Sequence, residues 1–218
     1  MKIKWYGHSS FLITSKEGTK IIIDPYEPQC YDGAIGYGAI KDIADIAVSS
    51  HDHADHGYIQ GLKGNPEVVN KEGEIKIKGV TFKGIKAYHD TEQGTQRGSV
   101  VIFKFLVDGI SICHLGDLGE MLADEQIKEL KPVDILLIPV GGVFTIDSKS
   151  ATNLIAMLNP RIIIPMHYKT EKCGFPLSDV DEFLKGKKNI KKTGTSELEL
   201  TKASLPAEPE IIVLEYAL

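Results

Sequence analysis

The residues best suited to chemistry lie in one short segment, His51-Asp52-His53-Ala54-Asp55-His56. In an extended chain, residues i and i+2 point the same way, so His51 and His53 can present two imidazoles to one metal ion. Asp55 and His56 emerge after the chain turns and point toward a neighbouring position. Asp52 is not expected to be a ligand. By itself, the segment predicts that the protein binds metal.

A site for two metal ions needs a third imidazole for the first ion, a second imidazole for the second ion, and a carboxylate between them. The chain offers His89, His167 and Asp117 for these roles. Two ions about 3.5 to 4 Å apart can share a bridging hydroxide and polarise a carbonyl or phosphoryl oxygen. We expect Asp55 or an adjacent water to carry the proton to the leaving group. This chemistry predicts hydrolysis of an ester, lactone, amide or phosphodiester.

Short β-type segments occupy the first half of the chain and lead to the histidines. The pattern predicts an antiparallel meander first, then a short strand before His51, then two hairpins that end at His89 and His114. These strands are expected at residues 3–6, 11–14, 20–23, 46–48, 74–78, 80–86, 100–106 and 110–113. Residues 25–40 have no period, and both a functional lid and a plain surface loop remain open for them.

The second half alternates between helical and buried strand patterns, which is typical of layered α/β packing. Helices are expected at residues 124–130, 148–158 and 178–185, and strands at 135–138, 162–164 and 211–215. No repeat and no change of composition marks a boundary. The sequence therefore predicts one domain over residues 1–218.

Composition narrows the range of partners. The net charge is −5 and no basic residues repeat along one face, which argues against nucleic acid as a partner. The lysine-rich stretch 185–192 is expected to be a solvated helix end and turn. Three widely spaced cysteines favour a reducing compartment, and no apolar stretch is long enough to span a membrane. We expect a cytoplasmic protein without membrane or nucleic-acid partners, and the sequence leaves its oligomeric state open.

The histidine segment resembles the HxHxDH signature of the metallo-β-lactamase superfamily. Within it, the chain is most similar to the L-ascorbate-6-phosphate lactonase-like group of zinc-dependent hydrolases, which also resembles N-acyl phosphatidylethanolamine phospholipase D. The resemblance covers residues 1 to about 170. It rests on HDHADH and on the segments Gly7-His8-Ser9, Ile22-Ile23-Asp24-Pro25, Ala87-Tyr88-His89, His114-Leu115-Gly116-Asp117 and Ile164-Pro165-Met166-His167-Tyr168.

The resemblance implies an αββα sandwich with a dinuclear site at one edge of its two sheets. It implies two divalent ions, Zn²⁺ in the first place, with Mn²⁺ or Fe²⁺ as alternatives. One ion would be held by His51, His53 and His89, the other by Asp55, His56 and His167, with Asp117 bridging.

Three further residues have open roles. The resemblance places Asp24 beneath the histidine segment, where it could accept a hydrogen bond from a ligating imidazole, although an aspartate that ends a strand before a proline is an equal alternative. His114 is expected to hydrogen-bond behind the ligands or in the core rather than to bind metal. His8 could take part in the pocket or be a structural histidine in a turn.

The substrate is expected to be a small anionic molecule. Arg97 or Lys169 could pair with its charge, although each alone is more often a surface cation. The loop 141–147, which includes Thr145, and Tyr168 after His167 could also hold it. Two other classes of function stay open, namely an iron-dependent oxidoreductase with persulfide or oxygen chemistry and a nuclease. A metal-binding relative without catalytic activity is a further alternative.

Overall fold

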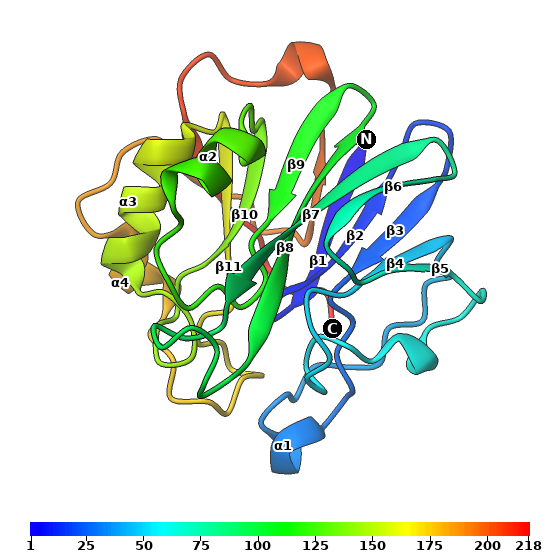
Figure 1. The fold of residues 1–218 in the computed structure, drawn as a ribbon, viewed down its shortest axis with the longest axis horizontal. Coiled ribbons are helices and arrows are strands. Elements are labelled where there is room, and N and C mark those ends of the chain that lie inside the picture. The colour runs from blue at the N-terminus through cyan, green and yellow to red at the C-terminus, as the bar shows by residue number, and fades with distance from the viewer.

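The structure, a computed structural model, describes residues 1–218 and consists of two β-sheets packed face to face (Figure 1). In spatial order, the first sheet contains β13 (Glu197–Glu199), β1 (Lys2–Gly7), β2 (Ser10–Thr14), β3 (Lys20–Ile23), β4 (Ile46–Val48) and β5 (Glu67–Val69). The second contains β12 (Ile190–Lys192), β14 (Glu210–Val213), β11 (Ile162–Met166), β10 (Ile135–Pro139), β9 (Ile110–His114), β8 (Ser99–Val107), β7 (Val80–Tyr88) and β6 (Gly73–Ile77).

Each sheet combines an antiparallel half with a parallel half. The meander β1–β2–β3 is antiparallel, as predicted, and β4 and β5 then add in parallel. In the second sheet β6 to β9 are antiparallel, whereas β10, β11, β14 and β12 continue in parallel. The predicted two-sheet α/β sandwich is therefore confirmed.

The core between the sheets follows from the two-residue period of a strand. In β3, Ile21 and Ile23 belong to a cluster of 50 buried residues that takes side chains from both sheets. Ile22 points to the other face and belongs to a second cluster of 8 buried residues. Tyr26 and Tyr37 of the irregular stretch after β3 complete that second cluster. Part of the predicted loop 25–40 is therefore core, and this stretch covers the first sheet where a helical layer would otherwise lie.

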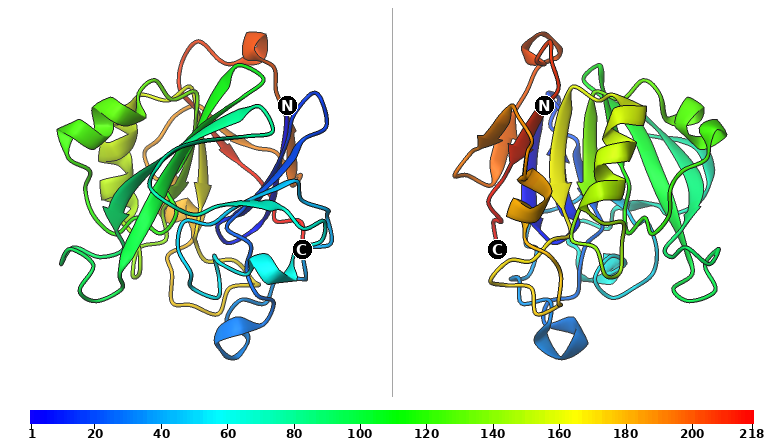
Figure 2. Two further views of the ribbon diagram at one scale, coloured as in Figure 1. Left: turned by 45° about the vertical axis from the view of Figure 1, so that its right-hand side comes forward. Right: turned by 90° about the vertical axis from the view of Figure 1, so that its left-hand side faces the viewer.

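The main helices cover the outer face of the second sheet, whereas the short α1 lies apart at the bottom of the molecule (Figures 1 and 2). They are α2 (Asp124–Leu130), α3 (Ser148–Leu158) and α4 (Val180–Leu184), and α1 spans Cys30–Gly33. The side chain of Asp147 caps α3 by accepting a hydrogen bond from the Ser150 amide at 2.8 Å, and Asn159 ends the helix with a positive φ of 50°. Single 3-10 turns lie at η1 (Ile59–Gly61) and η2 (Lys202–Ser204).

Most predicted elements appear within one or two residues of their expected bounds, and α2 and α3 match them fully. The structure adds the short strands β5, β12 and β13, which were not predicted. The lysine-rich stretch 185–192 begins with the expected solvated turn after the end of α4, but its last residues, 190–192, form β12, which was not expected. Its three residues are exposed, and an exposed edge strand has no alternation of apolar side chains to reveal it. No helix of the chain is long and apolar enough to cross a membrane.

Candidate metal centre

The histidine-rich centre forms where five loops from both sheets meet at one edge of the sandwich. β7 and β9 both run antiparallel to β8, and β11 is aligned with β9 through β10, so their carboxyl ends share one edge. His89, Asp117 and His167 follow these three strands, and the histidine segment follows β4 in the other sheet. His8 arrives from the turn between β1 and β2.

Two glycines allow the loops to come this close. A Cβ at Gly119 would lie 2.3 Å from the backbone carbonyl carbon of His89, and one at Gly141 would lie 2.2 Å from the carbonyl oxygen of His167. Both distances are below any van der Waals contact, so only glycine fits without moving the backbone of a histidine.

Three residues of the centre have strained backbones. His8, Asp24 and His167 have φ values of 51°, 42° and 50°, in the left-handed region that costs a non-glycine residue about 1–3 kcal/mol. The carbonyl of His8 accepts hydrogen bonds from the His167 amide at 3.1 Å and from Trp5 Nε1 at 3.0 Å, which hold the two loops together. Such strain is typical of functional sites.

The first group of possible ligands consists of His51, His53 and His89, whose ring nitrogens lie within 4.8 Å of one another. His51 Nε2 and His53 Nδ1 are 3.0 Å apart. His89 Nδ1 donates to the carbonyl of Phe144 at 3.1 Å, which leaves Nε2 with a free lone pair. The three rings therefore direct nitrogens at one point, as a metal ion requires.

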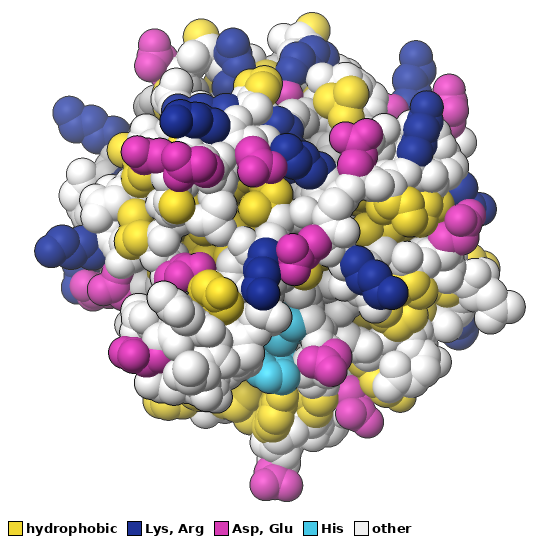
Figure 3. All heavy atoms as spheres, in the orientation of Figure 1, with side chains coloured by type: hydrophobic (Ala, Val, Ile, Leu, Met, Phe, Trp, Pro, Cys, Tyr) yellow, Lys and Arg dark blue, Asp and Glu magenta, His cyan; other side chains and the backbone are white.

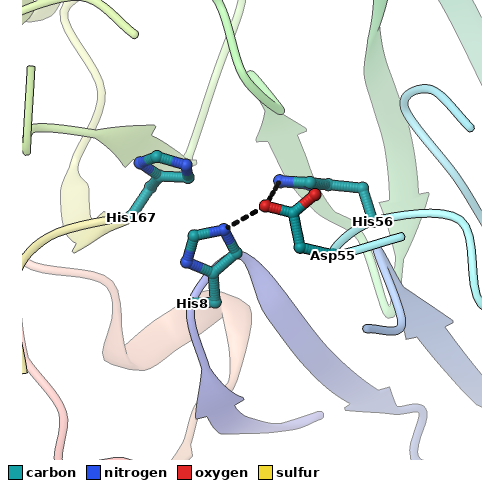
Figure 4. Close-up of side chains that lie close together, drawn as sticks. All are labelled: His8, Asp55, His56 and His167. Carbon is teal, nitrogen blue, oxygen red and sulfur yellow. Dashed lines mark hydrogen bonds and ion pairs between the residues drawn. The ribbon is translucent and has the colours of Figure 1, made fainter. Parts of the chain in front are cut away.

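The second group consists of His8, Asp55, His56 and His167 (Figure 4). Asp55 Oδ2 lies 3.1 Å from His8 Nε2 and 3.7 Å from His56 Nε2. His8 packs its ring against that of His167 with 4.2 Å between centroids. The structure thus places His8 among the residues expected as ligands, in contact with Asp55.

Asp117 lies between the two groups. Its Oδ2 is 3.1 Å from His56 Nε2 and 3.3 Å from the Nε2 atoms of His89 and His167. One carboxylate oxygen is therefore close to an imidazole of the first group and to two imidazoles of the second. This is the position that a bridging ligand occupies.

Asp24 supports the centre from below and is fully buried. Its carboxylate accepts hydrogen bonds from the Ser50 amide at 2.7 Å, the Ser50 hydroxyl at 2.8 Å, His56 Nδ1 at 3.0 Å and His114 Nε2 at 2.7 Å. Because the Ser50 hydroxyl donates to Asp24, it accepts from His51 Nδ1 at 3.0 Å. One carboxylate thus directs the Nε2 atoms of His51 and His56 toward the ligand groups. His114 faces Asp24 rather than these groups.

Charges in the centre favour a cation. Burial lowers the pKa of His56, but the carboxylates of Asp117 and Asp55 outweigh it and raise that pKa well above its usual value. Burial together with neighbouring imidazoles lowers the pKa of His51 to about 3 and that of His8 to about 4, so these rings are neutral. Neutral imidazole is the form that binds metal.

Buried polar atoms without hydrogen bonds are a second observation that fits a bound metal ion. Asp117 Oδ1 is buried and has no hydrogen-bond partner, and the buried His56 Nε2 lies 3.1 Å from Asp117 Oδ2 without the geometry of a hydrogen bond. Unpartnered buried polar atoms are rare in folded proteins, because each costs desolvation energy. A cation among the imidazole nitrogens and carboxylate oxygens would satisfy such atoms.

A cavity of about 390 Å³ opens above the centre and is bordered by His53, Asp55, Arg97 and Phe144, among others. Histidine side chains that are only partly buried are visible at the bottom of a hollow, with hydrophobic side chains along its lower border (Figure 3). A larger cleft of about 740 Å³ elsewhere contains no histidine. The smaller cavity is therefore the one that opens onto the possible metal ligands.

Of the four residues expected to hold substrate, only Arg97 lines this cavity. Thr145 donates to the carbonyl of Ile146, Tyr168 is buried against Trp5, and Lys169 donates to the carbonyl of Phe175. These three therefore support the surrounding loops.

Phe144 borders the cavity and lies in the loop 141–147, which was expected to hold substrate, whereas sequence reasoning missed Ser50, Tyr31 and Phe175. Ser50 directly precedes His51, and this position at the strand end was the available signal. Tyr31 lies in the stretch 25–40, for which a functional lid was left open, and Phe175 lies in a segment without a period that nothing in the sequence marks.

Comparison with known proteins agrees with this geometry. Residues 2–167 match the family model described as a beta-lactamase superfamily domain. A solved structure from Thermotoga maritima, assigned to the Zn-dependent hydrolases of the metallo-beta-lactamase superfamily, is 36% identical and covers 98% of each chain with a TM-score of 0.81.

Two UPF0173 metal-dependent hydrolases are also similar. The one from Nitratidesulfovibrio vulgaris strain DP4 is 33% identical over 201 residues, covering 78% of this chain and 80% of its own. The one from Pyrococcus abyssi is 31% identical over 211 residues, covering 85% and 91%. The chain therefore belongs to the metallo-beta-lactamase superfamily and, within it, to the UPF0173 family of metal-dependent hydrolases.

Proposed function

We propose that the protein hydrolyses a small anionic substrate with a dinuclear metal centre. The observation that carries this proposal is the position of Asp117 Oδ2, within 3.3 Å of imidazole nitrogens from both ligand groups. The proposed ligands are His51, His53 and His89 for one ion, Asp55, His56 and His167 for the other, and Asp117 between them.

Imidazole nitrogens and carboxylate oxygens suit Zn²⁺, with Mn²⁺ or Fe²⁺ as alternatives. When bound, two such ions supply a nucleophile at neutral pH and polarise the carbonyl or phosphoryl oxygen of a substrate. Hydrolysis adds one water across the scissile bond: the water oxygen bonds to the acyl carbon or phosphorus, the bond to the leaving oxygen breaks, and that oxygen takes up a proton.

Asp55 is proposed to move this proton. It borders the cavity, and its Oδ2 is held at 3.1 Å from His8 Nε2. A carboxylate within hydrogen-bond reach of the reacting atoms can accept a proton from water and return it to the leaving oxygen. His8 orients this carboxylate and is therefore proposed as a positioning residue.

The bond cleaved is proposed to be an ester, lactone or phosphodiester bond. The resemblance to the ascorbate-6-phosphate lactonase-like group supports a lactone, and the cation of Arg97 beside the cavity supports an anionic substrate. The net charge of −5 supports the further proposal that nucleic acid is not a partner. The three cysteines, none of which forms a disulfide, support the proposal that the protein acts in the cytoplasm.

Residues 1–218 are proposed to act as one domain. The main core cluster supports this, because it draws on residues from Met1 to Leu214 and joins both sheets. The centre takes side chains from both sheets as well.

Metal removal tests the proposed function. We expect a chelator to abolish hydrolysis in a panel of lactone, ester, thioester and phosphodiester substrates, and two equivalents of Zn²⁺ to restore it. Elemental analysis should find two ions per chain, and Mn²⁺ and Fe²⁺ are assayed in parallel. Full activity of the metal-free protein would contradict the proposal, and one iron per chain would favour the oxidoreductase alternative.

A second expected result concerns His8. His8→Leu removes the hydrogen bond to Asp55 and should weaken binding of the second Zn²⁺ ion about 10- to 100-fold, the range for partners of metal ligands. His8→Gln can still donate an N–H and should recover part of this affinity. Titration with Zn²⁺ against a competing chelator measures both ions. Equal affinity for the second ion in wild type and His8→Leu would show that His8 does not position Asp55.

A further inference from the structure

The cavity above the metal centre has an aromatic wall built from three separate loops. Phe144 and Phe175 meet edge to face with 5.3 Å between centroids and a 73° interplanar angle. Tyr31 of α1 lies 5.6 Å from Phe175. Tyr31 is 47% exposed although it is a large aromatic residue, so its ring is available for contact at the cavity mouth. Three aromatic rings at one wall favour a flat apolar group in the ligand.

Arg97 gives the same cavity a positive charge at one side. Its guanidinium carbon lies 5.6 Å from the Phe144 ring centroid, and the residue is half-buried. It forms no ion pair with any carboxylate of the chain within 4.0 Å. An arginine next to a ligand cavity without a counter-ion is suited to bind a carboxylate or phosphate in bidentate fashion.

The loop that carries Arg97 is held in one shape by a single buried carboxylate. Asp90 accepts the backbone amides of Glu92 and Gly94 at 2.8 and 2.9 Å through Oδ1, and those of Gln96 and Arg97 at 3.0 and 2.8 Å through Oδ2. The Asp90 carboxylate binds these backbone amides and forms no ion pair with the guanidinium within 4.0 Å. The loop is thus preorganised and presents a free cation to the cavity.

We propose that the substrate of this site is an amphipathic anion: an aryl or similarly flat group packed on Phe144, Phe175 and Tyr31, with a carboxylate or phosphate bound by Arg97. This inference rests on the proposed hydrolase function and adds the substrate class to it. The cavity of about 390 Å³ is near the lower end of the range for small-molecule sites, so it suits one ring with short substituents.

A set of matched esters tests the inference. We compare kcat/KM for 4-carboxyphenyl acetate, 4-phosphonophenyl acetate, phenyl acetate and ethyl acetate in the metal-loaded wild type and in variants. The preference for an anionic over a neutral aryl ester should fall about 10- to 100-fold in Arg97→Met, as expected for the loss of charged hydrogen bonds. Arg97→Lys should recover part of it. The two anionic esters tell whether a carboxylate or a phosphonate, which stands in for phosphate, fits better.

Two further variants complete the test. Phe144→Leu should lower the preference for phenyl acetate over ethyl acetate about 3- to 10-fold, because an aromatic contact is lost. Lys149→Met removes the same charge from the exposed surface of α3 and should leave every preference unchanged. Equal preferences in Arg97→Met and Lys149→Met would overturn the inference.

Binding measurements separate this inference from the proposed function. If the metal-loaded protein hydrolyses none of the esters, the proposed ester hydrolysis is wrong, but the proposed ligand class is still testable. Calorimetry with 4-hydroxybenzoate then measures whether the cavity binds an aromatic anion. We expect this probe to bind wild type at least about 10-fold more tightly than Arg97→Met. Equal affinity for the two proteins, or no binding to either, would overturn the inference.

Discussion

Asp117→Ala should remove both bound metal and activity. The side chain contributes the one oxygen that lies 3.1–3.3 Å from imidazoles of both ligand groups, so its loss affects both ions at once. Mutation of a residue that only orients a metal ligand typically lowers metal affinity or activity about 10- to 100-fold. Because Asp117 is proposed to bind both ions directly, we expect the variant to lose more than about 100-fold in kcat/KM. Elemental analysis should find fewer than two ions per chain.

Asp52→Ala is the matched control for this variant. Asp52 belongs to the same histidine-rich segment, but its side chain is exposed and belongs to neither ligand group. Metal content and kcat/KM should therefore stay at the wild-type level. Full metal content and full activity in Asp117→Ala would refute its assignment as the bridging ligand.

Asp24→Asn should destabilise the protein even without metal. The carboxylate is fully buried and accepts four hydrogen bonds, two from Ser50 and one each from His56 and His114. Burial alone would raise its pKa, but His114 and His56 outweigh this and hold the pKa well below its usual value. An amide must donate from one side and cannot accept all four bonds. Breaking such a buried pair costs about 3–5 kcal/mol.

The sign of the pH dependence follows from that pKa. A carboxylate whose pKa is lower in the folded state stabilises the fold above its unfolded pKa, near 4, and this stabilisation is lost as the pH falls toward the folded value. At pH 7 the contribution of Asp24 is therefore fully present. Thermal unfolding of the metal-free protein at pH 7 should show a Tm lowered by roughly 6–20 °C in Asp24→Asn.

Asp181→Asn provides the comparison for Asp24. Asp181 pairs with Lys192 on the surface, and its side chain is 70% exposed. Such a pair contributes about 0–1 kcal/mol, so the Tm should shift by only a few degrees. A Tm of Asp24→Asn that equals the Tm of Asp181→Asn would show that the Asp24 network contributes no stability.

The sequence was informative where one strong physical signal dominates. The run Ile21-Ile22-Ile23 is buried on both faces of its sheet, where a polar side chain would cost desolvation energy. Such a short, continuous apolar run predicts a buried strand. The seven residues expected as ligands lie together in the structure because each follows the end of a strand at one edge. Because His and Asp are common metal ligands, their presence at such positions predicts a metal site.

The remaining features depend on contacts between distant parts of the chain. The exposed strands β12 and β13 pair at sheet edges, and no apolar period marks them. Tyr31 and Phe175 reach the cavity from loops whose course is set by tertiary packing. The contact of His8 with Asp55 joins residues 47 positions apart, and a turn histidine gives no sign of such a partner.

The origin of the ligands in both sheets links metal binding to folding. His8 and His167 meet only after the first and last thirds of the chain have come together, so an unfolded chain has no preformed site of high affinity. Ions that bind only the folded state shift the folding equilibrium by mass action, by about 2.7 kcal/mol at a free concentration 100 times the dissociation constant. Bound metal is therefore expected to add to the stability of a fold that also forms without it, as well as to supply the chemistry of the site.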